Sequence, residues 1–380
     1  MREDFKIRLL QIWVPEYRLA LYEGVGRRYP GRFDIQSSQA RDNDSPLYEV
    51  KGVPCDYSHG LTKIGPFYWE AGLSLSGLKK DDVVVVDGNI RNLGMMFAVV
   101  RARLKGLRIV WWAQHWTPGT EMWRVRLRVL VSRMLADVYL CYTKSGIEFL
   151  ANAGYPRNRL YATGNTIDET EVKRAIDAWD LGKLSAFRLN KGIDGKNVLL
   201  VCGVLRKKLQ LGKIIRALAD QRLVARNTML VVIGDGEDKK ACEQLSKDIG
   251  VADRIIWVGA TRNQVELAPW FLNAKVFVYF GSIGLSIIHS FLYGLPVVVH
   301  DNPNHHGPEF EAMSDGWTGY VFKENDLDDF IEKTVSITDD ESKRVIMGRH
   351  AQKVAHDNYS IERMIDNYCA AIEAARAASR

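Results

Sequence analysis

Short apolar runs alternate with longer amphipathic stretches along most of the chain. In the first half such runs begin at Ile7, Asp82, Gly106 and Ala136, and they are rich in β-branched residues. Runs of this kind are typical of buried strands, and the helix-length stretches between them predict β-α-β units with parallel sheets. We therefore predict an α/β fold.

The alternation stops over residues 176–196, where glycines occur without a strand-like run. It resumes at Val198 and continues through runs that begin at Met229, Arg254, Ala274 and Leu295. We predict two doubly wound Rossmann-like domains facing a cleft, because ligands bind outside the carboxyl ends of parallel strands. The expected parts are an N-terminal domain over residues 1–175, a linker over 176–196, a C-terminal domain over 197–355, and a helix over 356–380 that can cross back to the first domain.

Composition is that of a folded protein, with 47% hydrophobic and 26% charged residues among 380. The five cysteines show neither zinc nor C-x-x-C spacing. No apolar run approaches the ~20 residues that a bilayer span needs, and the start lacks a signal-like region, so we expect a cytoplasmic protein. The formal net charge is +6, and the whole excess lies in the first 170 residues. Either this distribution is chance, or a surface of the first domain meets something anionic, such as lipid headgroups, a phosphorylated acceptor or nucleic acid.

The densest candidate chemistry starts at Gly281. A turn that contains Gly281 and Gly284 leads from a predicted strand into a helix that begins near Leu285 and Ser286. Free backbone N–H groups and the positive end of the helix dipole at such a start can hold a diphosphate without a metal.

The same stretch continues with GLPVVV, then Pro308-Glu309 and DGWTGYVF at Asp315. In order and spacing it resembles the donor site of nucleotide-sugar glycosyltransferases of the GT-B type, in particular the large retaining family 4. The resemblance covers nearly all of the chain and is strongest from Val198 to Phe322. It implies a transferase that moves a sugar from a nucleotide-sugar donor to a saccharide or lipid-linked acceptor. It further implies retention of anomeric configuration, no metal or other cofactor, no nucleic-acid partner, and a role in surface polysaccharide, lipopolysaccharide or glycolipid assembly.

The resemblance also implies site residues. Basic side chains after the first strand of the second domain should neutralise the donor's diphosphate, and Arg206 and Lys208 are expected to act catalytically in this way. An ungapped match instead puts Val204 and Leu209 at these positions, and a solvated basic loop is the alternative. The remaining donor-binding residues expected are Gly203, Lys207, Gly281, Gly284, Leu285, Ser286, His289 and Glu309.

This sequence departs from the family at two positions. The family carries two glutamates eight positions apart, and Gly281 and His289 stand there instead. A ring nitrogen of His289 can still hydrogen-bond a ribose hydroxyl. The alternative for His289 is a structural side chain in the core.

In the first half, the resemblance places an acceptor-side loop at Glu16, Tyr17 and Arg18. The alternative there is a capped helix start with an exposed arginine. His115 follows a predicted strand end, where the family often carries a histidine facing the donor sugar, and we expect it to take a catalytic part.

Three further patterns concern metal binding, the cleft and the membrane. Asp42 and Asp44 form a D-x-D pattern in a polar run that indicates a turn, so no metal site is expected. His305 and His306 are expected to line the cleft rather than chelate together. The stretch from Trp123 to Met134 combines arginines with apolar residues, which suits either a helix on an anionic membrane or a helix packed on the sheet.

Two other functions remain open. A nucleotide-sugar 2-epimerase of the same fold would need carboxylates for acid and base chemistry, which are not evident here. A non-catalytic partner protein that kept the fold is the second alternative.

Overall fold

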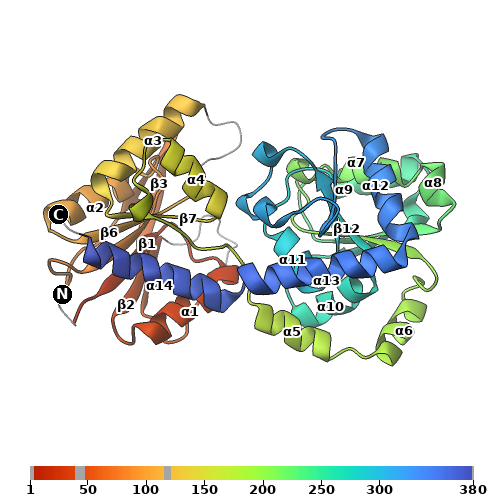
Figure 1. Ribbon diagram of the computed structural model, residues 1–380, viewed down its shortest axis with the longest axis horizontal. Helices are drawn as coiled ribbons and strands as arrows, with labels where there is room; N and C mark the ends of the chain where they lie inside the picture. Colours follow the sequence, from red (N-terminus) through yellow and green to blue (C-terminus); the bar gives the residue numbers. More distant parts are fainter. Residues whose placement is uncertain (1–3, 39–47, 115–120, 379–380) are drawn as a thin grey trace. The chain divides into compact units, whose positions relative to one another are not determined.

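The computed structural model describes residues 4–38, 48–114 and 121–378, apart from the side chains of residues 58 and 59. The chain forms two compact units. The first comprises residues 1–166 and 361–380, and the second comprises residues 167–360. Each unit contains a mainly parallel sheet with helices on its faces (Figure 1), which confirms the predicted α/β class with two Rossmann-like domains.

Within the described residues, the sheet of the first unit has the strand order β4-β3-β2-β1-β5-β6-β7-β8. Pairing between neighbours is parallel except in the β3–β4 hairpin. The strands are β1 (Ile7–Gln11), β2 (Phe33–Ser38), β3 (Cys55–Ile64), β4 (Phe67–Ala71), β5 (Val83–Asp87), β6 (Arg108–Trp112), β7 (Val138–Cys141) and β8 (Leu160–Ala162). The helices are η1 (Glu16–Arg18), α1 (Leu19–Arg28), α2 (Leu93–Leu104), α3 (Met122–Leu135), α4 (Lys144–Asn152), η2 (Arg157–Arg159) and α14 (Ile361–Ala377).

The apolar run of β5 shows why this sheet is buried on both faces. Val83 and Val85 pack into one hydrophobic cluster, whereas Val84 and Val86 pack into another on the opposite face. All four side chains are fully buried. A central parallel strand covered by helices on both sides requires apolar residues at every position, and this run supplies them.

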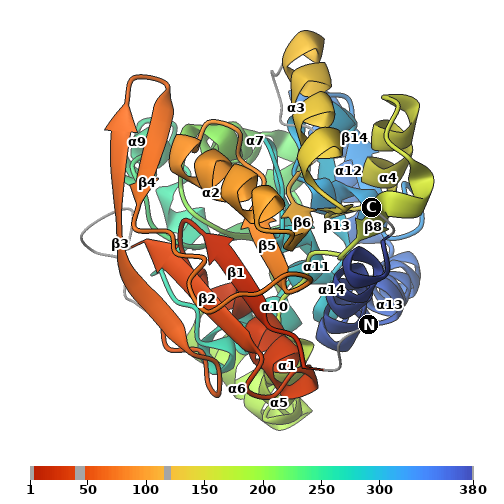
Figure 2. The same ribbon diagram turned by 90° about the vertical axis from the view of Figure 1, so that its left-hand side faces the viewer.

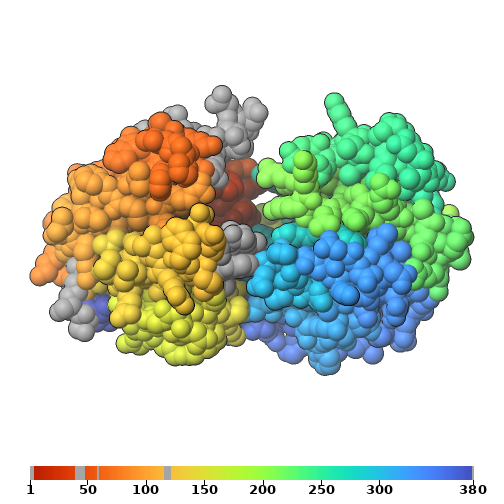
Figure 3. Space-filling model, turned by 90° about the horizontal axis from the view of Figure 1, so that it is seen from above, coloured from red at the N-terminus to blue at the C-terminus, as the bar shows by residue number. Residues whose placement is uncertain are grey.

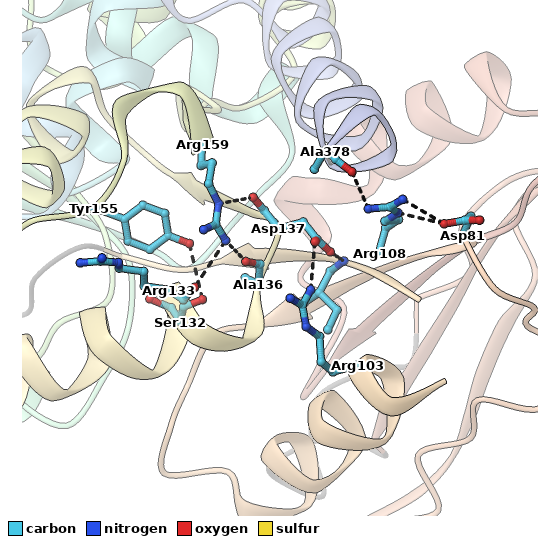
Figure 4. A network of polar contacts seen from close by, with 11 residues as sticks. Asp81, Arg103, Arg108, Ser132, Arg133, Ala136, Asp137, Tyr155, Arg159 and Ala378 are labelled. Atoms are coloured by element: carbon cyan, nitrogen blue, oxygen red, sulfur yellow. Dashed lines mark hydrogen bonds and ion pairs between the residues drawn. The ribbon is translucent and has the colours of Figure 1, made fainter. Parts of the chain in front are cut away.

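Helix α14 belongs to the first unit, and its end is held by the polar network of Figure 4. Arg108 at the start of β6 donates a 2.6 Å hydrogen bond to the carbonyl oxygen of Ala378 and forms an ion pair with Asp81. Beside it, the Asp137 carboxylate accepts hydrogen bonds from the Ile109 N–H and from Arg103. These contacts tie the amino ends of the central strands to neighbouring helices.

The described part of the second unit has a parallel sheet in the order β11-β10-β9-β12-β13-β14. The strands are β9 (Asn197–Cys202), β10 (Thr228–Ile233), β11 (Ile255–Gly259), β12 (Val276–Val278), β13 (Val297–His300) and β14 (Gly319–Phe322). The α-helices are α5 (Glu169–Asp177), α6 (Leu181–Asn190), α7 (Leu211–Ala217), α8 (Gln221–Val224), α9 (Lys239–Asp248), α10 (Gln264–Asn273), α11 (Ser286–Leu292), α12 (Leu327–Asp339) and α13 (Glu341–Asn358). Short 3-10 turns are η3 (Lys207–Leu209), η4 (Ala252–Arg254), η5 (Pro303–His305) and η6 (Pro308–Ala312).

The division between the units differs from the one expected from the sequence. The first unit ends at Thr166, and the segment expected as a linker, residues 176–196, contains α6 and the approach to β9. The Phe187 ring stands edge-on to the Trp179 and Trp270 rings, with centroids 5.6 and 4.8 Å away. These aromatic contacts pack α6 against α10 and make the segment part of the second unit.

Candidate functional site

In the second unit, two loops meet at the carboxyl ends of the adjacent strands β9 and β12. The Gly281 N–H donates to the Leu209 carbonyl at 3.0 Å, and the Ser282 N–H donates to the Lys208 carbonyl at 2.8 Å. A Cβ atom at Gly281 would lie 2.0 Å from the Lys208 carbonyl oxygen. This approach leaves no room for any side chain at position 281.

Beyond this contact, the chain turns into α11 and presents backbone donors. Within the described residues, the N–H groups of Gly284, Leu285 and Ser286 have no hydrogen-bond partner. The Ser286 hydroxyl donates to the Cys202 carbonyl at the end of β9. Both Ser286 Oγ and the Tyr279 hydroxyl lie within 4 Å of the position that a Cβ of Gly203 would occupy. The predicted residues Gly203, Gly284, Leu285 and Ser286 are therefore gathered in one place.

The basic cluster lies on the loop after β9. Arg206, Lys207 and Lys208 are exposed, and none of them forms an ion pair within the described residues. In the alternative register, Val204 is exposed but the Leu209 side chain is fully buried in the core. Because the Lys208 and Leu209 carbonyls bind the turn at Gly281, the cluster is fixed beside the start of α11.

Glu309 reaches the same turn from η6. Its side chain is buried, and its Oε2 atom lies 3.5 Å from the position of a Cβ at Gly284. The same oxygen would be 2.8 Å from a Cβ at Gly307. The carboxylate is therefore placed directly against the backbone of the glycine turn.

His306, which we expected to line the cleft, is a buried residue held by ring contacts and hydrogen bonds. It is 4% exposed, with its ring stacked between those of His300 and Phe310. Its Nε2–H donates to the His300 carbonyl at 2.9 Å, and its Nδ1 accepts the Ile283 N–H at 3.1 Å. Burial lowers the pKa of His306 to about 4, which keeps this tautomer neutral. The neighbouring His305 instead points outward and pairs with Glu324.

His289 lies on α11 with its ring against Phe271, at a centroid distance of 4.6 Å. Its Nε2 is 2.9 Å from Gln264 Oε1, which also accepts from the Tyr293 hydroxyl at 3.0 Å. With that oxygen as the acceptor, Nε2 carries the proton and Nδ1 is left as an acceptor. Burial lowers the pKa of His289 to about 4, so the ring is neutral.

The first unit has a cavity at the carboxyl ends of β1, β5, β6 and β7. Its lining residues are Leu9, Gln11, Trp13, Pro15, Tyr17, Arg18, Asp87, Trp112 and Tyr142. Tyr17 and Arg18, two of the three residues expected on the acceptor side, therefore belong to it. Glu16 does not line it and accepts a 3.0 Å hydrogen bond from the Tyr48 hydroxyl.

The Arg18 guanidinium is enclosed by aromatic rings. It lies 4.2 Å from the centre of the Trp112 ring and 5.2 Å from that of Tyr142. It also donates a 2.8 Å hydrogen bond to the Tyr142 hydroxyl. These contacts hold the side chain at the strand ends, and they replace the exposed arginine that was the alternative expectation.

Some predictions fall on residues that the structure does not describe, namely His115 and the D-x-D pair Asp42 and Asp44. In the part of the chain that is described, no group of three or more His, Cys, Asp or Glu side chains is arranged to hold a metal ion.

The sequence reasoning missed Gln11, Asp87 and Tyr142 as cavity residues. All three lie at the carboxyl end of a strand or directly after it, which is the edge where parallel sheets bind ligands. A polar residue that ends an apolar run was the available signal, as in VVVVD at Asp87.

Comparison with known proteins agrees with this arrangement. Residues 186–354 match the family described as Glycosyl transferases group 1. An N-acetyl-alpha-D-glucosaminyl L-malate synthase of Bacillus anthracis is 22% identical over 176 residues, which span 46% of this chain and 45% of the relative. The lipopolysaccharide core biosynthesis glycosyltransferase LpsE of Rhizobium meliloti is 28% identical over 142 residues, spanning 37% of this chain and 40% of that protein. The matches thus span less than half the length of these relatives.

Structural similarity to solved proteins extends over nearly the whole chain, further than the sequence matches do. The crystal structure of the Anabaena protein HepE in complex with UDP and glucose superimposes with a TM-score of 0.70 at 13% identity, covering 97% of this chain and all of that one. The chain therefore has the two-domain α/β fold of GT-B glycosyltransferases, and its residues 186–354 carry the sequence pattern of glycosyl transferases group 1.

Proposed function

We propose that the chain is a glycosyltransferase that moves a sugar from a nucleotide-sugar donor to a saccharide or lipid-linked acceptor. The observation that carries this proposal is the junction of the β9 loop with the glycine turn before α11, inside the segment that matches glycosyl transferases group 1. The similar fold of the Anabaena protein, solved with UDP and glucose, supports a nucleotide-sugar as the donor.

The diphosphate binds, in this proposal, between the start of α11 and the basic cluster. The N–H groups of residues 284–286 supply donors that have no partner in the described part of the chain, and the exposed side chains of Arg206 and Lys208 supply positive charge. As the glycosidic bond breaks, negative charge grows on the leaving phosphate oxygen, and charge-assisted hydrogen bonds stabilise it. Because backbone dipoles and cations provide this stabilisation, we propose that no metal is required.

We propose transfer with retention of configuration, in which an oxygen of the leaving diphosphate accepts the proton of the attacking acceptor hydroxyl. No protein nucleophile is needed for this path. It is supported by the turn itself, because the Lys208 carbonyl occupies the space where a side chain at position 281 would begin. His115, which lies outside the described residues, stays a prediction for a contact with the donor sugar.

His289 and Glu309 complete the proposed donor site. With Nε2 bound to Gln264, the His289 ring offers Nδ1 as an acceptor, so a ribose hydroxyl would donate to it. The Glu309 carboxylate lies beside Gly284, where it can accept hydrogen bonds from hydroxyl groups of the donor.

The role we propose is the assembly of surface polysaccharide, lipopolysaccharide or glycolipid, on the inner face of a membrane. The similarity to a lipopolysaccharide core biosynthesis glycosyltransferase supports this pathway.

A surface of the first unit supports the proposed attachment to a membrane. Figure 2 shows α2 between the β3–β4 hairpin and α3, and in Figure 3 these orange and yellow segments form much of the visible surface of that unit.

This surface, which we call the α2–α3 face, is apolar and exposed. Leu104 is 83% exposed, and Phe97 on α2 is 56% exposed with its ring 6.5 Å from that of Trp69 on β4. The further exposed apolar residues of the face are Ile64, Phe67, Leu93, Val100, Met122, Trp123, Leu127, Leu130 and Met134. On α3 the core contact is instead made by Val125 and Val129, so the side with Trp123 does not pack on the sheet.

Charge complementarity selects a membrane with anionic lipids. Helices α2 and α3 contain six arginines and no acidic residue. Basic residues near an anionic surface contribute about 1 kcal/mol each, and this attraction is screened by salt. Within the described residues, no helix is long and apolar enough to cross a bilayer, so the proposed attachment is peripheral.

Sedimentation with vesicles tests the attachment. Vesicles that contain phosphatidylglycerol should bind the protein and release it in high salt, and Phe97→Ser with Leu104→Ser should weaken binding. Exposed Leu181→Ser with Leu189→Ser, on α6 of the second unit, is the matched control. Equal binding to neutral and anionic vesicles would contradict the proposal.

Release of a nucleoside diphosphate tests the transferase activity. The protein should release UDP or another nucleoside diphosphate from its nucleotide-sugar, faster when an acceptor is present, and NMR of the product's anomeric proton should show retention. A nucleotide-sugar epimerised at C2 without transfer to an acceptor would favour the 2-epimerase. Donor binding without any turnover would favour a non-catalytic partner protein.

A further inference from the structure

The cavity of the first unit has the size of a site for a small organic molecule. Its volume is about 170 Å³, whereas one water molecule requires roughly 10–15 Å³. The rings of Trp13 and Tyr17 are half exposed at its wall, and those of Trp112 and Tyr142 are part of it. Aromatic walls of this kind suit a ligand with an apolar face, such as the C–H face of a sugar ring.

The cavity is lined by a cation, the Arg18 guanidinium. Arg18 makes no ion pair with a carboxylate within the described residues, and its hydrogen-bond partner is the Tyr142 hydroxyl. Burial raises the pKa of Tyr142, so that hydroxyl is a neutral phenol at pH 7. Arginine is always protonated, and a positive charge among aromatic rings is stabilised further by an anion.

Three residues that line this cavity carry buried hydrogen-bond donors for which the described residues offer no partner. The Nε2 atom of Gln11, the Nε atom of Arg18 and the Nε1 atom of Trp112 are buried, and none has a hydrogen-bond partner among residues 4–38, 48–114 and 121–378. Gln11 and Trp112 are 5% and 4% exposed as residues. Gln11 is fixed, because its Oε1 already accepts a 2.7 Å hydrogen bond from the Tyr22 hydroxyl. All three unsatisfied groups are N–H donors, and an unsatisfied buried donor is costly unless a ligand or solvent accepts from it.

We propose that this cavity binds an acidic acceptor, a saccharide whose carboxylate or phosphate group is held by Arg18 with Gln11 and Trp112. The proposal rests on the glycosyltransferase function and names the chemical class of its acceptor. Carboxylate and phosphate share the required chemistry, which is negative charge with several acceptor oxygens at one centre. Asp87 lines the same cavity. It provides an acceptor for the hydroxyl groups of the sugar, which donate to carboxylates.

Calorimetric titration of the full chain with three sugars tests the proposal. D-Glucuronate carries a carboxylate, D-glucose 6-phosphate carries a phosphate, and D-glucose is the neutral reference. At least one charged sugar should bind on the order of 10- to 100-fold more tightly than glucose, which is the difference expected for charge-assisted hydrogen bonds. Whichever charged sugar binds more tightly identifies the source of the anion.

Three variants separate recognition from folding. Arg18→Gln should abolish the preference for the charged sugar, whereas Arg27→Gln, which removes an exposed arginine from α1, should retain it. Trp112→Phe keeps an aromatic ring but removes the Nε1–H donor, so it should reduce the preference without unfolding the chain. It therefore gives an answer even if Arg18→Gln does not fold.

The outcomes also separate this proposal from the transferase function. Equal affinity for all three sugars would overturn the proposal that the acceptor is acidic. A preference for the charged sugar that both Arg18→Gln and Trp112→Phe leave intact would overturn it as well. A titration with UDP in parallel reports on the donor site of the second unit. UDP binding with no discrimination among the sugars overturns the acceptor class alone, and failure of UDP and other nucleotides to bind overturns the transferase function.

Discussion

Replacing Gly281 with alanine perturbs the contact that joins the two loops of the proposed donor site. The added Cβ would lie 2.0 Å from the Lys208 carbonyl oxygen, and the obstacle is backbone, which cannot rotate away. Gly284→Ala is a matched control in the same turn, because its Cβ would meet its nearest atom, Glu309 Oε2, at 3.5 Å. Neither glycine has a positive φ, so both variants share the entropic effect of the substitution on the unfolded chain.

The clash at position 281 determines how far the melting temperatures of the two variants differ. Forcing an extra carbon into a packed site costs typically 1–3 kcal/mol. For a unit of about this size, each kcal/mol lowers the Tm by about 2–4 °C. Thermal unfolding should therefore show Gly281→Ala melting about 2–12 °C below Gly284→Ala. Gly281→Ala should also bind UDP more weakly, because its turn and the loop of Lys208 must separate. Equal melting temperatures with unchanged UDP affinity would refute the close approach.

Three further predictions concern the second unit. His289→Ala should weaken donor binding by about 1–3 kcal/mol in calorimetry; an unchanged donor Kd with a sharply lower Tm would instead show a purely structural histidine. EDTA should leave transfer activity intact, whereas activity lost in EDTA and restored by manganese would contradict metal independence. Because burial lowers the folded-state pKa of His306 from 6.5 to about 4, the unfolded chain binds this proton first, and stability should fall by up to about 3 kcal/mol as the pH drops from 6.5 to 4. The free energy of unfolding, measured with urea across this range, should depend less on pH in His306→Gln than in the unsubstituted chain. An identical dependence would show that His306 is not its source.

The fold was predictable because its strands are buried on both faces. A run such as Val83–Val86 has no polar position, and the 3.6-residue pattern of the segments between strands indicates the helices that cover them. The limits of the second unit were not found, because glycines near residues 182–195 suggested a linker. The aromatic contact of Phe187 with Trp270, which makes α6 part of that unit, joins residues far apart in the sequence.

The residues of the proposed donor site were indicated by local sequence, unlike those that line the cavity of the first unit. The glycine turn and the basic cluster each consist of neighbouring residues, whereas the cavity combines residues from four strand ends. Nothing in the local sequence indicates that Tyr142 meets Arg18, which lies 124 positions away. Nor does it show that His306 supports the Ile283 N–H, since that contact depends on how the loops after β12 and β13 close on each other.

A thermal-shift screen against UDP-, GDP-, ADP- and dTDP-sugars in EDTA tests whether the second unit binds a nucleotide-sugar without metal. A ligand that binds only the folded state stabilises it by about 2.7 kcal/mol at a concentration of 100 Kd. At least one of these nucleotide-sugars should raise the Tm without metal, and Gly281→Ala should diminish the shift. Absence of any shift at millimolar concentrations, or a shift that appears only with added manganese, would contradict metal-free binding.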